Sequence, residues 1–134
     1  IGTVKTKNAI KESEKVISSF DVKTPGTNTL ATALSGGNQQ KFVVGRELED
    51  NPNLLIASQP TRGIDIGAQA LIWEKLRITR DQGLSVLLMS ADLEELIGLS
   101  DRIIVFYQGR LVKELNAKNV TPEDLGGYMT GLKK

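Results

Sequence analysis

The chain contains no cysteine and no histidine among its 134 residues. Without cysteine there are no disulfides and no thiol chemistry, and without histidine there is neither an imidazole base nor the commonest metal ligand of proteins. Aromatic residues make up only 4% of the chain. No apolar run approaches the roughly 20 residues of a membrane-spanning helix, and no signal peptide is visible at Ile1. These absences exclude a disulfide scaffold and favour a reducing compartment.

An excess of charge of either sign is also missing. The chain has 17 basic and 16 acidic residues, which gives a net charge of +1. Nucleic acids and anionic membranes attract strongly basic surfaces, so we expect no nucleic-acid partner. With 40% hydrophobic and 25% charged residues, the composition is that of an ordinary globular protein. The length fits one domain or part of one.

The most informative stretch is LSGGNQQK at residues 34–41, where Ser35, Gly36 and Gly37 stand directly before a helical pattern. Two adjacent glycines let a ligand approach the backbone closely, and the N–H groups at the start of a helix suit an anion such as phosphate. The Ser35 hydroxyl can add another donor. The structural alternative is that Ser35 simply caps the helix and the glycines form a turn, and SGG alone favours that alternative.

Helical and strand patterns alternate along the chain. We predict helices over residues 5–20, 35–50, 68–82 and 122–130, a short helix opened by a capping box of Asp92 and Glu95, strands over 54–57 and 84–89, and a hairpin of 103–107 with 111–115. The strand at 54–57 is continuously apolar, which predicts burial on both faces. The alternation predicts an α/β fold with a mostly parallel sheet and a late hairpin.

Two stretches together resemble a known family. LSGGNQQK resembles the signature motif of ABC transporter ATPases, and LLIASQPTRGID at residues 54–65 is similar to that family's Walker B strand and D-loop, with Asp65 in the D-loop. The residues of these motifs, together with LSDRIIVFYQGR at residues 99–110, are most similar to the branch of the family that imports nucleosides and simple sugars. The resemblance implies a partial P-loop NTPase cassette, with residues 1–50 a remnant of the helical subdomain and 51–134 the C-terminal half of the ATPase core. It fits the second cassette of a tandem ATPase.

Several features depart from the family pattern. No GxxxxGK followed by Ser or Thr occurs, so the Walker A half is missing and we expect the isolated chain to bind ATP at best very weakly and to be inactive. Ser58 stands where the family has an aspartate that supports Mg²⁺, Gln59 where a glutamate polarises the attacking water, and Ala91 where a histidine contacts the γ-phosphate. None of these three side chains can replace the original group. The resemblance therefore implies a degenerate site on this cassette, with no catalytic residue and no metal ligand in this chain.

Paired cassettes explain how an intact signature can accompany a degenerate site. In the family, two cassettes sandwich two nucleotides, and each nucleotide lies between the Walker motifs of one cassette and the signature of the other. The resemblance thus implies that Ser35 and Gly37 serve the partner cassette's site in trans. The nucleotide-side residues it implies are Ser35, Gly36, Gly37, Asn38, Gln39 and Asp65. ATP and Mg²⁺ would be cofactors of the full-length assembly, with transmembrane permease subunits as further partners at the cytoplasmic face of the cell membrane.

Two other functions remain open from the sequence. The chain could be a nucleotide-independent interaction module, in which its long helical start and the missing sheet strands form a docking surface. Separately, we expect uncovered apolar strand faces to make the chain self-associate into a homo-oligomer. A chromosome-maintenance ATPase also carries LSGG, but the chain has neither heptad repeats nor a basic excess. We rank that alternative last.

Overall fold

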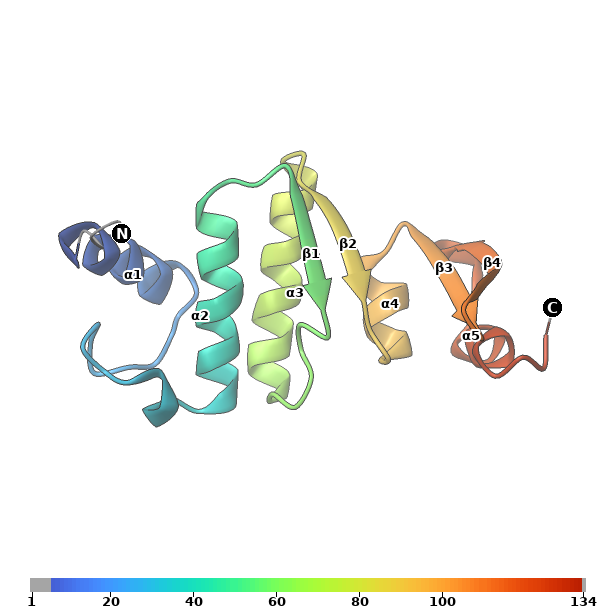
Figure 1. Cartoon of the computed structure of the whole chain (residues 1–134), viewed down its shortest axis with the longest axis horizontal. Helices are drawn as coiled ribbons and strands as arrows, with labels where there is room; N and C mark the ends of the chain where they lie inside the picture. Colours follow the sequence, from blue (N-terminus) through green and yellow to red (C-terminus); the bar gives the residue numbers. More distant parts are fainter. Residues whose placement is uncertain (1–5, 134) are drawn as a thin grey trace. The chain divides into compact units, whose positions relative to one another are not determined.

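The computed structural model describes residues 6–133, and helices and strands alternate along them (Figure 1). The chain forms two compact units that divide between Leu87 and Leu88. The first unit holds α1 (Thr6–Ser19), η1 (Ala31–Ala33), α2 (Gly36–Glu49), β1 (Leu54–Ser58) and α3 (Ile66–Asp81). Strand β2 (Ser85–Met89) crosses the division, and the second unit continues with α4 (Leu93–Leu99), β3 (Arg102–Tyr107), β4 (Arg110–Asn116), η2 (Ala117–Asn119) and α5 (Pro122–Met129).

The α/β fold predicted from the sequence is confirmed, and most elements lie within two residues of their expected places. The predicted start of the first helix, Lys5, lies outside the described residues. Helix α3 begins at Ile66, earlier than predicted, because Asp65 caps it by accepting a hydrogen bond from the Ala68 N–H. The short 3₁₀ helix η1 was not predicted from the Thr-rich stretch before the signature.

Three helices of the first unit supply most of its core. Helix α2 packs against α1 and against α3. The helices contribute the buried apolar residues Val16, Phe20 and Val22 from the α1 region, Val44 and Leu48 from α2, and Ala68, Ile72 and Leu76 from α3, and Ala57 and Leu84, in segments outside the helices, are also buried. The apolar stripe read from residues 5–20 thus faces α2, as an amphipathic helix requires.

Gly45 allows α1 to approach α2 closely. A Cβ at this position would lie 2.7 Å from both Phe20 Cδ2 and Val16 Cγ1, so no larger residue fits without movement. Both of those side chains are buried, with Val16 only 2% exposed. The glycine is therefore a packing requirement of the α1–α2 contact.

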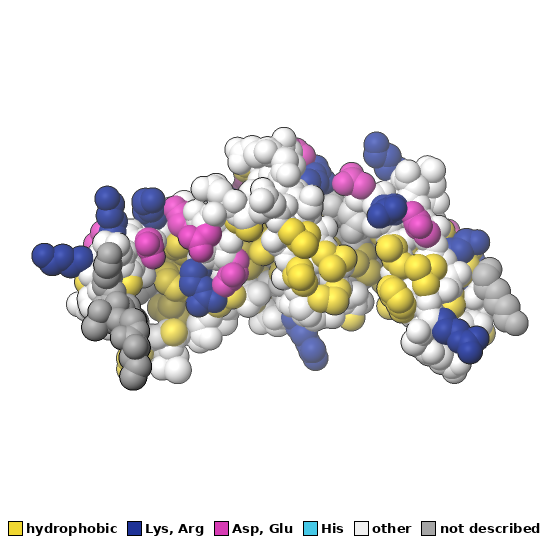
Figure 2. Space-filling view, turned by 45° about the horizontal axis from the view of Figure 1, so that its top comes forward, with side chains coloured by type: hydrophobic (Ala, Val, Ile, Leu, Met, Phe, Trp, Pro, Cys, Tyr) yellow, Lys and Arg dark blue, Asp and Glu magenta, His cyan; other side chains and the backbone are white. Residues whose placement is uncertain are grey.

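The strands are less covered than the sequence predicts. Strands β1 and β2 are neighbours in a two-stranded sheet, and their arrows run in the same direction in Figure 1. The prediction that residues 54–57 are buried on both faces is wrong for the described chain, because Leu54 is 54% and Ile56 61% exposed, whereas Ala57 is buried. Burial on both faces needs a layer on each side, and here alternate residues remain open. Figure 2 shows such exposed hydrophobic side chains gathered in patches on the surface.

The second unit is built around the predicted hairpin. Strands β3 and β4 pair antiparallel, and Gln108 and Gly109 join them with φ of 50° and 75°, the signature of a type I′ turn. Helix α5 begins with a capping box between Thr121 and Asp124. The core comprises Ile103, Val105, Ala117 and Leu125.

The predicted capping box of Asp92 and Glu95 forms only in part. The Asp92 carboxylate accepts the N–H groups of Glu94 and Glu95, as predicted. The Asp92 N–H, however, donates to Ser90 Oγ at 3.0 Å instead of closing the box with Glu95. Glu95 is 1% exposed, so its side chain lies inside the protein and not at the helix surface. This burial could not be predicted from the sequence, because adjacent Glu94 and Glu95 look alike there.

We predict opposite effects for two glycine substitutions in helices. Gly45→Ala places a methyl group against Phe20 and Val16, and overpacking of this kind costs about 1–3 kcal/mol of unfolding free energy. Gly126→Ala in α5, where a Cβ meets nothing within 4 Å, should instead stabilise the chain by about 0.5–1 kcal/mol through helix propensity. Urea unfolding followed by circular dichroism measures both. Equal stabilisation by the two variants would contradict the close approach at Gly45.

Candidate functional site

Ser35 stands at the N-cap position of α2 but does not cap it. Its backbone is extended, with φ −62° and ψ 156°, yet its side chain makes no capping hydrogen bond. Its Oγ instead accepts from Nδ2 of Asn38 at 3.0 Å. The side chains that precede α3, α4, η2 and α5 all cap their helices: Asp65, Asp92, Asn116 and Thr121. Ser35 therefore stands at the N-cap position, but its side chain does not act as a cap. The Ser35 side chain accepts no hydrogen bond from the N–H groups of the first turn of α2.

The two signature glycines have different surroundings. Gly36 is exposed, and a Cβ there would approach only the Gly63 carbonyl oxygen, at 4.0 Å. Gly37 is buried, and a Cβ there would lie 2.8 Å from Asp65 Oδ2 and 3.1 Å from Ala68 Cβ. A side chain at Gly37 would thus project toward the start of α3. Substitution of Gly37 therefore cannot report on a ligand at the helix end without disturbing this packing, whereas Gly36 faces open space.

Asp65 joins the D-loop to the signature helix. One carboxylate oxygen, Oδ1, accepts the Ala68 N–H at 2.9 Å and so begins α3. The other, Oδ2, lies against Gly37. The structure thus brings together Ser35, Gly36, Gly37 and Asp65, which the sequence placed in two separate motifs. Helix starts of α2 and α3 adjoin at this point, and Asp65 has a packing role as well as its predicted place in the site.

The first two amide side chains after the glycines, Asn38 and Gln39, make hydrogen bonds within the chain. Asn38 Oδ1 accepts the backbone N–H of Lys23 at 2.8 Å, across 15 residues of sequence. Gln39 Nε2 donates to the Leu34 carbonyl oxygen at 2.9 Å. Lys23 was not part of the predicted site, and its contact with Asn38 has no signature in the sequence because a backbone donor can belong to any residue.

Two of the three degenerate positions, Ser58 and Gln59, lie in the first unit, and the third, Ala91, lies in the second. Ser58 is exposed and ends β1, and Gln59 follows it with a φ of 51° at the strand's carboxyl end. Ala91 is exposed and belongs to the second unit, just after β2. Within residues 6–133, no three His, Cys, Asp or Glu side chains gather in a group that could hold a metal ion.

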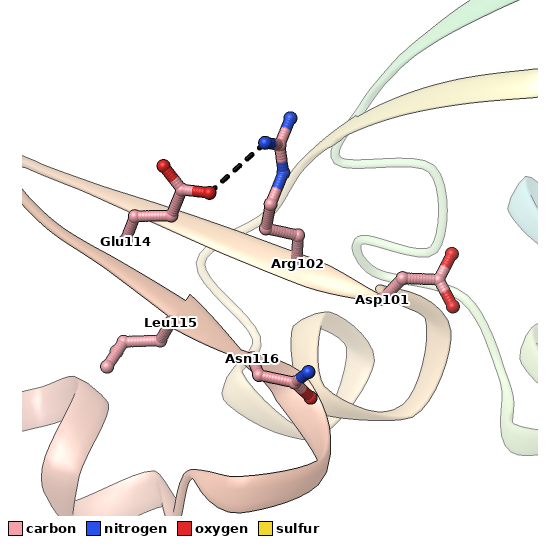
Figure 3. Close-up of a pocket in the computed structure, with 5 residues that line it drawn as sticks. All are labelled: Asp101, Arg102, Glu114, Leu115 and Asn116. Atoms are coloured by element: carbon pink, nitrogen blue, oxygen red, sulfur yellow. Dashed lines mark hydrogen bonds and ion pairs between the residues drawn. The ribbon is translucent and has the colours of Figure 1, made fainter.

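A surface hollow of about 540 Å³ lies in the second unit, lined by Asp101, Arg102, Glu114, Leu115 and Asn116 (Figure 3). Arg102 and Glu114 reach toward each other from β3 and β4 and form an ion pair of 3.1 Å whose side chains are mostly exposed. Asn116 accepts the Lys118 N–H and thereby caps η2. Each of these interactions is accounted for by the hairpin and its connection, and none of the predicted site residues lines the hollow.

Known proteins with similar sequences are import ATP-binding proteins. The guanosine import ATP-binding protein NupO of Bacillus subtilis is 47% identical over 131 residues, which cover 98% of this chain and 26% of the relative. The nucleoside import ATP-binding protein NupA of Lactococcus lactis subsp. cremoris is 43% identical over 87% of this chain and 23% of the relative. The ribose import ATP-binding protein RbsA of Clostridium tetani is 40% identical over 94% of this chain. The chain thus spans about a quarter of the length of these relatives. No protein-family model matches it.

Solved structures with the same fold are ABC transporter cassettes. The dimeric MJ0796, a bacterial ABC transporter cassette, superposes with a TM-score of 0.72 at 22% identity over 90% of this chain and 52% of that one. A nucleotide-free cassette from an ABC transporter gives 0.72 at 20% identity over 94% of this chain and 48% of that one. The chain belongs to the ABC transporter ATP-binding cassettes. It fits the C-terminal part of such a cassette, as its motifs predict. Among residues 6–133, no helix has both the length and the apolar character needed to cross a membrane.

The different surroundings of Gly36 and Gly37 generate a prediction for stability. Gly37→Ala should lower the free energy of unfolding by about 1–2 kcal/mol, because the methyl group meets Ala68 and a carboxylate held in place by its capping bond. Gly36→Ala meets no close neighbour and should be neutral or slightly stabilising. Denaturant unfolding of the two variants gives the comparison. A larger loss for Gly36→Ala would show that the glycine roles are reversed.

Proposed function

We propose that this chain is the part of an importer ATPase that presents the signature motif to a nucleotide held mainly by a partner cassette. The relatives import guanosine, other nucleosides and sugars such as ribose, which supports a nucleoside or simple sugar as the cargo. In this proposal residues 1–50 are the end of a helical subdomain and 51–134 the C-terminal half of the ATPase core. Transmembrane permease subunits would be further partners of the assembled protein.

The observation that carries the proposal is the uncapped start of α2. Backbone N–H groups at a helix start carry partial positive charge and attract phosphate oxygens. At the starts of α3, α4 and α5 a side-chain oxygen occupies that place, whereas Ser35 leaves it open at α2. The exposed Ser35 hydroxyl and the exposed Gly36 backbone lie at the same end. The Ser35 hydroxyl and the first N–H groups of α2 together can donate hydrogen bonds to the terminal phosphate of a nucleoside triphosphate.

The same proposal assigns no hydrolytic role to this chain's own Walker B region. Ser58 offers a neutral hydroxyl where a carboxylate would support Mg²⁺, and Gln59 offers an amide that cannot take a proton from water at neutral pH. Ala91 has no polar side chain. ATP and Mg²⁺ would therefore be held by other residues of the assembly, and the residues of this chain would bind and orient phosphate from the opposite side.

We predict asymmetric effects on steady-state ATP turnover by the assembled transporter. Gly36→Asp places a carboxylate at the uncapped helix end, where it is favourable for the helix but repels phosphate. Turnover should fall on the order of 100-fold, the size of effect seen when a donor to a developing charge is lost. Gln59→Ala should leave turnover within about twofold, because no proton transfer is assigned to that side chain.

Unfolding measurements on both variants serve as the control, since neither should lower the stability of the parent chain. If Gln59→Ala abolishes turnover while Gly36→Asp is tolerated, the in-trans assignment is wrong. A glycine at this position is a better probe than Gly37, whose substitution acts on the packing against Asp65 and Ala68.

A second candidate is a nucleotide-independent interaction module. The exposed apolar residues of β1 and β2 favour it: Leu54, Ile56, Leu87 and Met89. Such side chains are normally covered, and in this proposal a second copy of the chain or another protein covers them. This candidate needs no phosphate at α2.

Two measurements on the isolated chain test these candidates in turn. Because the Walker A amides and lysine are missing, calorimetric titration with Mg-ATP should show no binding tighter than millimolar. A micromolar dissociation constant, equivalent to about −8 kcal/mol, would contradict the division of labour between cassettes. Light scattering at tens of micromolar shows in the same samples whether the chain self-associates, as expected if a second copy of the chain covers the exposed strands.

A further inference from the structure

We propose that Asn38 is a positioning residue that fixes the direction of the Ser35 hydroxyl proton. The inference rests on the proposed function, in which Ser35 donates to a phosphate oxygen. It assigns Asn38 to the support of Ser35 and not to contact with the nucleotide. Among the described residues, the side chain of Asn38 links the signature serine to the end of α1.

The orientation of the Asn38 amide follows from its two partners. The backbone N–H of Lys23 can only donate, so the amide atom facing it at 2.8 Å must be the carbonyl oxygen Oδ1. The amino group Nδ2 then faces Ser35 Oγ at 3.0 Å and donates to it. Oxygen and nitrogen of an amide are often hard to tell apart, but a backbone donor settles the assignment.

The Lys23 N–H is held in place by the way α1 ends. Asp21 has a φ of 48°, the Val22 N–H donates to the Ile17 carbonyl at 3.0 Å, and the Asp21 N–H donates to the Ser18 carbonyl at 3.5 Å. These bonds form a Schellman motif. Val22 is 5% exposed, so the residue before Lys23 is anchored in the core. Lys41 from α2 adds a hydrogen bond to the Asp21 carbonyl oxygen at 3.3 Å.

This arrangement determines what Ser35 offers to a ligand. A serine hydroxyl has one proton and two acceptor sites. Because Asn38 Nδ2 uses an acceptor site, the hydroxyl proton is free to point away from Asn38, and Ser35 is exposed to solvent. Phosphate oxygens only accept hydrogen bonds, so a serine that donates outward is the form that binds them. Without Asn38 the hydroxyl could turn its proton into the chain.

The substitution Asn38→Asp reverses the bond while keeping the fold. One carboxylate oxygen still accepts the Lys23 N–H, and a negative charge in the first turn of α2 favours the helix. The other oxygen now accepts the Ser35 proton, so Ser35 presents lone pairs to the ligand. Asn38→Ala removes both bonds and should lower the unfolding midpoint, whereas Asn38→Asp should not. Comparing the two variants separates a defect of stability from a defect of hydroxyl direction.

A double-mutant cycle on steady-state ATP turnover by the assembled transporter tests the inference. We expect Asn38→Asp to lower kcat about tenfold in the parent background and less than about twofold when Ser35→Ala is already present, because it acts through the serine hydroxyl. Asn116→Asp is the matched control. Asn116 also accepts one backbone N–H, from Lys118 at 3.0 Å, and its substitution should leave kcat unchanged.

The outcomes distinguish this inference from the proposed function. If Ser35→Ala lowers kcat but Asn38→Asp is equally harmful with and without Ser35, the added carboxylate acts by repelling phosphate and the positioning role is overturned. If Asn38→Asp leaves kcat unchanged while Ser35→Ala lowers it, the positioning role is also overturned and the proposed function stands. If Ser35→Ala has no effect on kcat, the proposed function fails and this inference fails with it.

Discussion

The structure of the first unit depends on how closely α2 approaches the helices on its two sides. Gly45 lets Val16 and Phe20 of the α1 region lie against the α2 backbone, and Gly37 does the same for the start of α3. Interiors are packed too densely to absorb a methyl group at such contacts without movement. The position of the signature helix is therefore set by two glycines on its buried sides, and its uncapped end is placed by that packing.

The predicted site inherits its geometry from this packing. Asp65 lies beside Gly37 and caps α3, so the D-loop and the signature helix are fixed to one another. Asn38 reaches the end of α1 through Lys23 and supports Ser35. A displacement of α1 or α3 against α2 would therefore change the phosphate-facing end, even though neither helix supplies a donor there. In the proposed importer, a partner that displaces α1 would therefore also shift Ser35 relative to the nucleotide, through Lys23 and Asn38.

Helices and turns were largely predictable from the sequence because their signals are local. The Thr121 cap, the Gln108 and Gly109 turn, and the apolar stripe before Phe20 all depend on residues a few positions apart. What could not be predicted depends on distant neighbours. The adjacent Gly36 and Gly37 look alike in sequence, but only one meets Asp65. The contact of Lys23 with Asn38 and the exposure of Ile56 likewise depend on what lies opposite each residue in space.

An intact signature motif does not by itself indicate nucleotide binding, because some of its residues are required by the packing of α2. Gly37 and Asp65 are needed where α2 meets α3, and Asn38 ties α2 to the end of α1, with or without ATP. The Ser35 hydroxyl and Gly36 are different. Ser35 does not cap its helix, and a Cβ at Gly36 would meet no close neighbour. Neither residue is needed for the packing of α2, so the functional interpretation depends on these two. Substituting Ser35 or Gly36 can therefore change phosphate binding without changing stability.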